Sequence, residues 1–300
     1  MQNTMTRALQ HAPAFDQRPL RVPDWLARVS RESPEDAGVS SGAVLALLDL
    51  SQANPSLPQA LWRARLALKA AAHAVALSNR PEREATLRDI LCLLRPGEQP
   101  GPAGEIALAW SRATTRPLSD AGLKRALPGL SASQFHLWHT TRHGNPVAQA
   151  ACIIEAILTD APRDTVTALI LADAVLSRAM GWPHLTPLLG VSVPRRDLKL
   201  RGDDLRLACH KALVRAVSDA LALGADLTRR AAQLHAVAPK LRSRQAAQAV
   251  DLFLSRDAIA PAALSPLMSD RAARRLCDRL VTLGAVREMT GRDTFRLYGL

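Results

Sequence analysis

The chain draws its apolar residues mainly from Ala and Leu, and this choice constrains the fold more than any other feature. Hydrophobic residues make up 48% of the 300 residues, whereas aromatic residues make up only 3%. Ala and Leu lose little side-chain freedom in a helix, while strands favour β-branched and aromatic side chains. The composition therefore predicts a mainly α fold, with enough apolar surface to exclude a disordered chain.

Apolar periodicity and helix caps predict a multi-helix bundle over residues 39–238. After Pro58, apolar side chains recur at three- and four-residue steps and so share one helix face. Asn145 and Asp164 are typical N-caps, and Ser40 or Ser41 can cap the first helix of the body. The predicted helices cover residues 43–50, 58–79, 81–94, 102–113, 119–127, 131–140, 146–158, 165–180, 203–223 and 225–238.

Three segments interrupt the helical pattern. Residues 1–38 contain four prolines and little periodicity, which predicts a loosely ordered N-terminal arm, with Trp25, Leu26 and Val29 as candidates for packing on the body. The sequence RPGEQPGPAG at 95–104 is the clearest internal break, and residues 181–202 form a second irregular segment.

Net charge and cysteine content restrict the partners and the compartment. The formal charge of +12 favours an acidic partner, chiefly nucleic acid, although an arginine-rich composition also occurs in ordinary proteins. The four cysteines form no CxxC pair, which argues against a zinc knuckle or a redox motif. The apolar run at 166–180 contains Asp173 and Arg178, and the N-terminus has no signal-peptide pattern. We therefore expect a soluble, cytoplasmic protein with no membrane partner.

The segment 239–300 has a different character from the body. A helix is predicted over 270–283, and two short helices, over 243–255 and 262–267, precede it. Two strands, 286–289 and 294–298, follow and are joined by a turn around Gly291. This order predicts a winged helix-turn-helix module with a single short β-hairpin.

Basic residues are concentrated in this module. Between residues 239 and 300, eleven basic and six acidic residues give +5 of the total charge. Burial of the apolar helix face directs the arginines of the 270–283 helix outward, toward DNA edges or phosphates. Protein docking and a purely structural role are the alternatives. The candidate nucleic-acid-binding residues are Ser269, Arg271, Arg274 and Arg275 on the helix, and Arg287, Arg292 and Arg296 on the hairpin.

Three segments together resemble a bacterial family, domain-of-unknown-function family 1403. They are LRDILCLLRPGEQPGPAG, APKLRSRQAAQAVDLFLSRDAIAP and MSDRAARRLCDRLVTLGAVREMTGRDTFRLYGL. The last segment also resembles the C-terminal winged helices of other bacterial helix-turn-helix proteins. The resemblance implies one architecture over most of the chain and implies no activity and no catalytic residues.

Other motifs are weak indicators of chemistry. Residues 38–42 match the GxSxG pattern, but the polar sequence before them does not form the buried strand that a nucleophile elbow requires. His136, His139 and His143 share a face only if their helix continues, and no nearby carboxylate or thiolate completes a metal site. The prolines of 95–104 remove N–H donors that a phosphate cradle needs.

The sequence therefore predicts a DNA-binding or regulatory protein that acts on double-stranded DNA through its C-terminal winged helix. A non-enzymatic adaptor that binds a protein partner, or a second copy of itself, is the alternative. An enzyme built on the helical body ranks third. We expect no cofactor and no metal.

Overall fold

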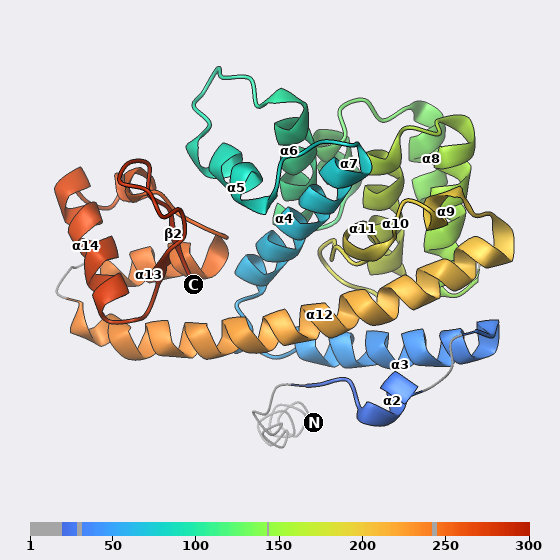
Figure 1. The fold of residues 1–300 in the computed structure, drawn as a ribbon, viewed down its shortest axis with the longest axis horizontal. Helices are drawn as coiled ribbons and strands as arrows, with labels where there is room; N and C mark the ends of the chain where they lie inside the picture. Colours follow the sequence, from blue (N-terminus) through green and yellow to red (C-terminus); the bar gives the residue numbers. More distant parts are fainter. Residues whose placement is uncertain (1–19, 29–31, 143, 242–244) are drawn as a thin grey trace, which may run out of the picture.

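The computed structural model describes residues 20–28, 32–142, 144–241 and 245–300. The fold is mainly α, as predicted, with one two-stranded antiparallel sheet near the C-terminal end of the chain (Figure 1). The helices before residue 200 are α2 (Asp24–Arg28), α3 (Pro34–Gln52), α4 (Gln59–Leu77), α5 (Glu84–Leu93), α6 (Gly101–Thr115), α7 (Asp120–Ala126), α8 (Ala132–Thr140), α9 (Pro146–Asp160), α10 (Thr165–Ala179), α11 (Leu189–Ser192) and the 3-10 turn η2 (Asp197–Lys199).

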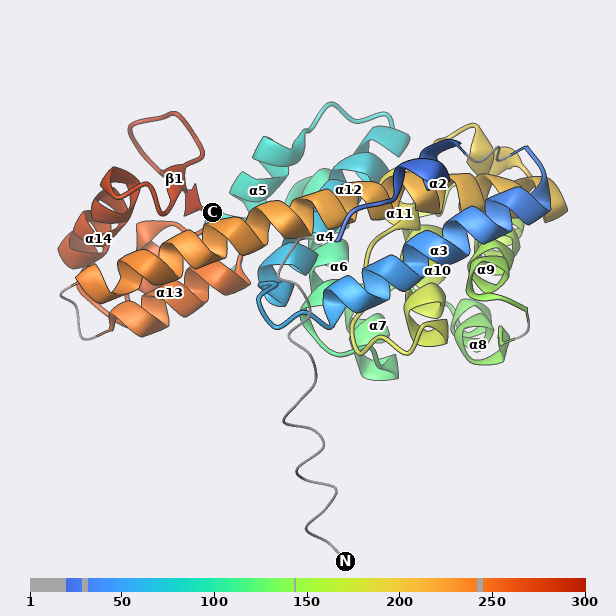
Figure 2. The ribbon, with the colours of Figure 1, turned by 90° about the horizontal axis from the view of Figure 1, so that it is seen from below.

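A single long helix, α12 (Gly202–Val237), runs along most of the molecule, and α3 lies beside it (Figures 1 and 2). The prediction of two helices separated at Gly224 is wrong. A glycine in a helix interior costs only about 1 kcal/mol, which packing can outweigh. At this level of α12, Trp62 of α4 donates a 2.9 Å hydrogen bond from Nε1 to the carbonyl oxygen of Ala220.

The first helix of the body begins earlier than predicted. Helix α3 starts at Pro34, and Ser33 is its N-cap, with Oγ accepting from Asp36 N at 3.1 Å. The predicted caps Ser40 and Ser41 lie in the middle of this helix and are buried. A serine cap followed by proline and two acidic residues is the stronger start signal, because each residue suits the first turn.

Part of the predicted N-terminal arm is therefore helical. Helix α2 lies within it, and Leu26 is fully buried, whereas Trp25 is half exposed. The first residues of α3 also belong to the predicted arm. Residues 1–19 and 29–31 of the arm lie outside the described residues.

Several other helix starts are confirmed. Asn145 and Asp164 cap α9 and α10 with their side-chain oxygens. Ser131 and Gln134 form a reciprocal capping box at the start of α8. The break at 95–104 is also confirmed up to Gly101, where α6 begins.

Residues 246–300, named here the C-terminal module, form one end of the molecule (Figure 1). The 3-10 turn η3 (Ala238–Lys240) follows α12. The module contains α13 (Ala246–Ser255), the 3-10 turn η4 (Pro261–Leu264), α14 (Asp270–Thr282), β1 (Arg287–Glu288) and β2 (Tyr298–Gly299).

The hairpin is shorter than predicted. Arg287 pairs with Gly299 and Glu288 with Tyr298, so the second strand begins at 298 and not at 294. Phe295 has a φ of 54°, a left-handed conformation that cannot continue a strand. Tyr298 of β2 pairs with Ile259 as well as with β1. The two residues exchange two 2.9 Å backbone hydrogen bonds, a pairing that no sequence pattern indicated.

Candidate nucleic-acid interface

Helix α14 is fixed by its own ends and by its apolar face. Ser269 is the N-cap, and its Oγ accepts from Ala272 N at 3.4 Å. Gly284, with a φ of +68°, ends the helix in a left-handed turn, as predicted. The buried face consists of Ala273, Leu276, Cys277 and Leu280. The arginines of α14 are consequently on the outside.

These arginines are exposed to solvent. Arg271, Arg274 and Arg275 have exposed side chains, as does Arg279, which was not among the residues predicted for the site. Among the described residues none of the four forms an ion pair, although ion pairs occur elsewhere in the module. The helical spacing that selected Arg275 could also have found Arg279, because the two are four residues apart.

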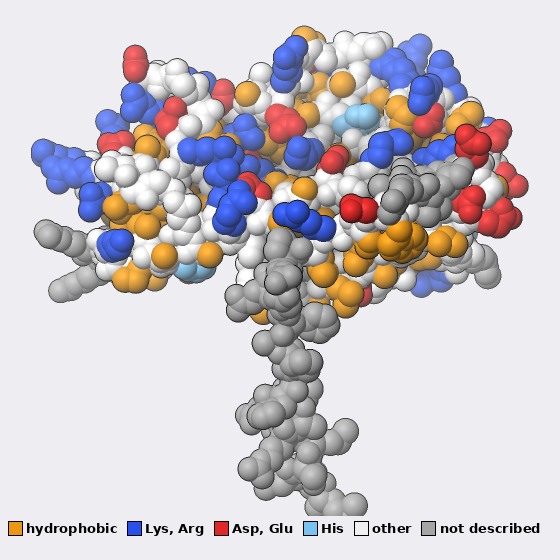
Figure 3. Space-filling model, turned by 60° about the horizontal axis from the view of Figure 1, so that its bottom comes forward, with side chains coloured by type: hydrophobic (Ala, Val, Ile, Leu, Met, Phe, Trp, Pro, Cys, Tyr) orange, Lys and Arg blue, Asp and Glu red, His pale blue; other side chains and the backbone are white. Residues whose placement is uncertain are grey.

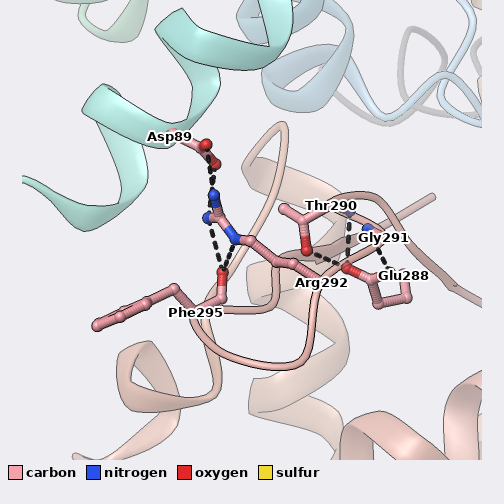
Figure 4. A network of polar contacts seen from close by, with 6 residues as sticks. All are labelled: Asp89, Glu288, Thr290, Gly291, Arg292 and Phe295. Atoms are coloured by element: carbon pink, nitrogen blue, oxygen red, sulfur yellow. Dashed lines mark hydrogen bonds and ion pairs between the residues drawn. The ribbon is translucent and has the colours of Figure 1, made fainter.

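The structure directs one hairpin arginine, Arg292, toward the helical body. Figure 4 shows that the guanidinium of Arg292 points toward Asp89 of α5, at 2.8 and 2.9 Å from its carboxylate oxygens. The same guanidinium donates to the carbonyl oxygen of Phe295 at 2.8 Å. Arg292 therefore links the loop between β1 and β2 to the helical body. While its guanidinium is bound to Asp89, it is not available to contact DNA.

The base of this loop is also internally bonded. Glu288 accepts hydrogen bonds from Gly291 N at 2.8 Å and from the backbone and hydroxyl of Thr290 (Figure 4). Slight burial raises the pKa of Glu288, but these hydrogen bonds outweigh that effect and the net pKa is lowered. The turn around Gly291, which has a φ of +61°, is as predicted.

Arg274 and Arg296 reach a shared hollow of about 610 Å³ between α14 and the hairpin loop. The hollow also contains Asp270, Asp278 and Asp293, so its charge is mixed. Arg296 forms an exposed 3.3 Å ion pair with Asp293. Arg271 and Arg275 do not line this hollow.

Arg287 lies on β1, on the side nearer the body. It is exposed, yet its charge is close enough to influence Arg65 of α4. Burial is the main cause that lowers the pKa of Arg65, Asp257 partly offsets it, and the charges of Arg88 and Arg287 lower it further. The seven predicted residues are thus not one continuous surface.

Figure 3 shows Lys and Arg side chains at the end of the molecule that α14 forms, with Asp and Glu side chains among them. Further Lys and Arg side chains lie toward the opposite end, beside a group of Asp and Glu side chains, so this face carries both charges along its length.

The other motifs do not converge on a site. Residues 38–42 lie inside α3, without the strand-to-helix turn of a nucleophile elbow. Ser41 is hydrogen-bonded to His210 Nδ1 at 2.7 Å, and both side chains are buried between α3 and α12. This contact joins two helices.

Helix α8 contains His136 and His139 and ends at Thr140. His139 lies beside Asp120, with 3.3 Å between Nε2 and Oδ2, and His143 is outside the described residues. Within the described ranges, no group of three or more His, Cys, Asp or Glu side chains is placed to hold a metal ion. Nor does any described helix have the length and apolarity needed to cross a membrane.

These features define a mainly α protein that ends in a small, arginine-bearing module of helices and a hairpin. A family model described as "Protein of unknown function (DUF1403)" matches residues 12–300, and the chain belongs to this family. The resemblance found in the three sequence segments is thereby confirmed. No functionally curated protein matches the chain.

Proposed function

We propose that the protein binds double-stranded DNA through its C-terminal module, which acts as a winged helix in a regulatory role. The observation that carries the proposal is the exposed face of α14, on which Arg271, Arg274 and Arg275 lie without carboxylate partners among the described residues. Like charges on neighbouring turns of a helix repel one another, and phosphate groups would relieve that repulsion.

The order of elements supports this assignment. A helix (α13), an extended residue (Ile259), a short turn of helix (η4), a second full helix (α14) and a hairpin follow one another. In helix-turn-helix proteins the helix in the position of α14 enters the major groove, while neighbouring elements contact the backbone. The proposal assigns no catalytic step to the helical body.

Arg271 and Arg275 are the strongest candidates for DNA contact, because neither lines the hollow that contains the three aspartates. Arg274 lines the hollow with these aspartates, and Arg296 would contact DNA only after leaving its ion pair with Asp293. Arg292 positions the hairpin loop through Asp89.

Replacing Arg271, Arg274 and Arg275 with alanine tests the proposal. Exposed substitutions usually change the free energy of unfolding by no more than about 0.5 kcal/mol, so the variant should remain folded. Fluorescence anisotropy with a mixed-sequence duplex, measured against salt concentration, should show weaker binding. The log–log salt dependence should flatten by about one unit for each phosphate group that the variant no longer neutralises.

A matched control removes the same charge elsewhere. Arg116, Arg125 and Arg215 are exposed, lie on the helical body and form no ion pair among the described residues. Their triple alanine variant should retain most of the wild-type affinity. Equal reductions in both variants would mean that net charge alone is responsible, and absence of salt-dependent binding in the wild type would exclude the proposal.

A protein-binding adaptor is the second candidate function. Two exposed apolar side chains of the module favour it, Val281 on α14 and Phe295 on the hairpin loop, the latter 63% exposed. Exposed aromatic side chains are common at protein interfaces. The adaptor function would become the leading candidate if the wild-type protein did not bind DNA.

A further inference from the structure

Arg63 of α4 is a buried cation that has no counter-ion among the residues that the structure describes. Its residue surface is only 9% exposed, and its Nε has no hydrogen-bond partner within the part of the chain that the structure describes. Its Nη1 lies 3.3 Å from Gln59 Oε1, which is a neutral acceptor. Burial lowers the pKa of Arg63. Buried charges are normally paired, so an isolated guanidinium indicates a missing anion.

Arg63 lines a cavity of about 560 Å³ between the helical body and the C-terminal module. Helices α4, α5 and α6 form one side of the cavity, and residues 255–260 with Ala263 form the other. The volume falls in the range typical of small-molecule sites. Neither Arg63 nor this cavity belongs to the DNA-binding surface proposed above.

The charges that face the cavity are predominantly positive. Arg63, Arg88 and Arg256 line it together with one carboxylate, Asp257. That carboxylate already pairs with Arg88, at 2.6 Å, and with Arg65. Among the residues that line the cavity, no carboxylate is therefore left to pair with Arg63.

The remaining lining combines hydroxyl groups with small apolar side chains. Ser111, Thr114 and Thr115 of α6 supply the hydroxyls. The apolar part consists of alanine and aliphatic side chains, among them Ala64, Leu68, Leu91 and Ala107. An apolar wall with one isolated cation fits a molecule that has an apolar part and one anionic group.

We propose that this cavity is a binding site for a small organic anion, whose carboxylate, sulfonate or phosphate group pairs with Arg63. The apolar part of the anion lies against the alanines of α4 and α6. Because the walls come from the body and from the module, a bound anion bridges the two. The site is independent of DNA binding and holds whether or not the module binds DNA.

The probe for the test is 8-anilino-1-naphthalenesulfonate, an organic anion whose fluorescence rises on transfer to an apolar site. We expect one saturable site per wild-type chain and a higher Tm in its presence, because binding to the folded state stabilises it. Arg63→Met should weaken binding at least tenfold, whereas Arg63→Lys should retain most of it. Arg116→Met, on the exposed surface, is the matched control and should bind like the wild type.

Two further measurements test the charge of the probe and the volume of the cavity separately. The uncharged analogue N-phenyl-1-naphthylamine should bind the wild type and Arg63→Met equally, since it lacks the anionic group. Ala64→Leu, which fills the cavity and leaves every charge in place, should weaken binding of both probes and serves if Arg63→Met does not fold. Equal sulfonate binding by wild type, Arg63→Met and Ala64→Leu, or no saturable site in the wild type, would overturn the proposal.

Discussion

Asp173 and Arg178 show how charged residues are accommodated in the apolar helix α10. The Asp173 carboxylate is fully buried and accepts backbone hydrogen bonds from Leu188, Leu189 and Gly190, at 3.1, 2.8 and 2.9 Å. Arg178 lies 4.3 Å from the centre of the Trp138 ring and donates to two carbonyl oxygens at the end of α8. Both residues thus fix the segments that pack on α10.

Asp173 should make stability depend on pH. Burial raises its pKa to about 7, against the opposing effect of the three backbone hydrogen bonds. Between pH 3.8, its ordinary pKa, and about 7, the folded chain holds a proton that the unfolded chain has released. The contribution of Asp173 to the free energy of unfolding should therefore be greatest at the acidic end of this range, and it should fall as pH rises to about 7.

Urea unfolding at a series of pH values measures this effect as the difference between wild type and Asp173→Asn. Over that pH range, the difference in the free energy of unfolding should fall as pH rises, by no more than one bound proton would cause. Above that range, the difference should not change with pH. Asp160→Asn, at the exposed end of α9, is the control for removal of a surface carboxylate. A difference curve that rises with pH would mean that the carboxylate is stabilised in its ionised form.

At the scale of elements, α12 shows that packing decides where a helix continues. Gly224 lies in its interior, where a glycine favours the unfolded chain. A methyl group added there would lie 3.4 Å from Leu57 Cδ1 and 3.6 Å from Trp62 Nε1, which are ordinary van der Waals distances. The position therefore has room for a side chain.

We expect Gly224→Ala to stabilise the protein by about 0.5–1 kcal/mol, because alanine loses less conformational entropy on folding. Gly190→Ala is the contrasting variant. Its methyl group would overlap the ring of Trp110, so it should destabilise by about 1–3 kcal/mol. Thermal unfolding of both variants distinguishes the two outcomes. A destabilised Gly224→Ala would show that the contact with α4 requires glycine.

At the scale of the whole molecule, the C-terminal module is anchored to the body by buried ionic contacts. Asp257 pairs with Arg65 of α4 and Arg88 of α5, and Arg65 also donates to the backbone oxygen of Leu300 at 3.0 Å. Cys92 adds a 3.4 Å contact to Ala258. Together with the Asp89–Arg292 pair, these contacts hold α5 against the module.

Asp257→Asn should destabilise the protein by about 3–5 kcal/mol, because it leaves two largely buried guanidinium groups without their carboxylate. Asp251→Asn, exposed on α13, is the control and should change stability by no more than about 0.5 kcal/mol. Chemical denaturation measures both. A destabilisation below about 1 kcal/mol for Asp257→Asn would mean that the arginines find other partners or solvent, and that the module is held mainly by apolar contacts.

Local signals in the sequence determined most of the helices and the character of α14. The caps at Asn145, Asp164 and Ser269 are correct because a cap depends on residues within one turn. The outward direction of Arg271 and Arg275 follows from helical spacing alone. These parts of the fold and of the candidate site could be predicted because the interactions that decide them join residues no more than four positions apart.

The other features depend on contacts between residues that are far apart in the chain. Arg292 has the chemistry of a DNA contact, but its partner Asp89 lies 203 positions away. Tyr298 pairs with Ile259 as well as with β1, and α12 continues through Gly224 where it meets α4. Arg63 resembles any helical arginine in the sequence, and its isolation exists only because three helices and the module enclose it. Burial and partner choice at these positions depend on which distant segments the fold brings together, and no local pattern encodes that.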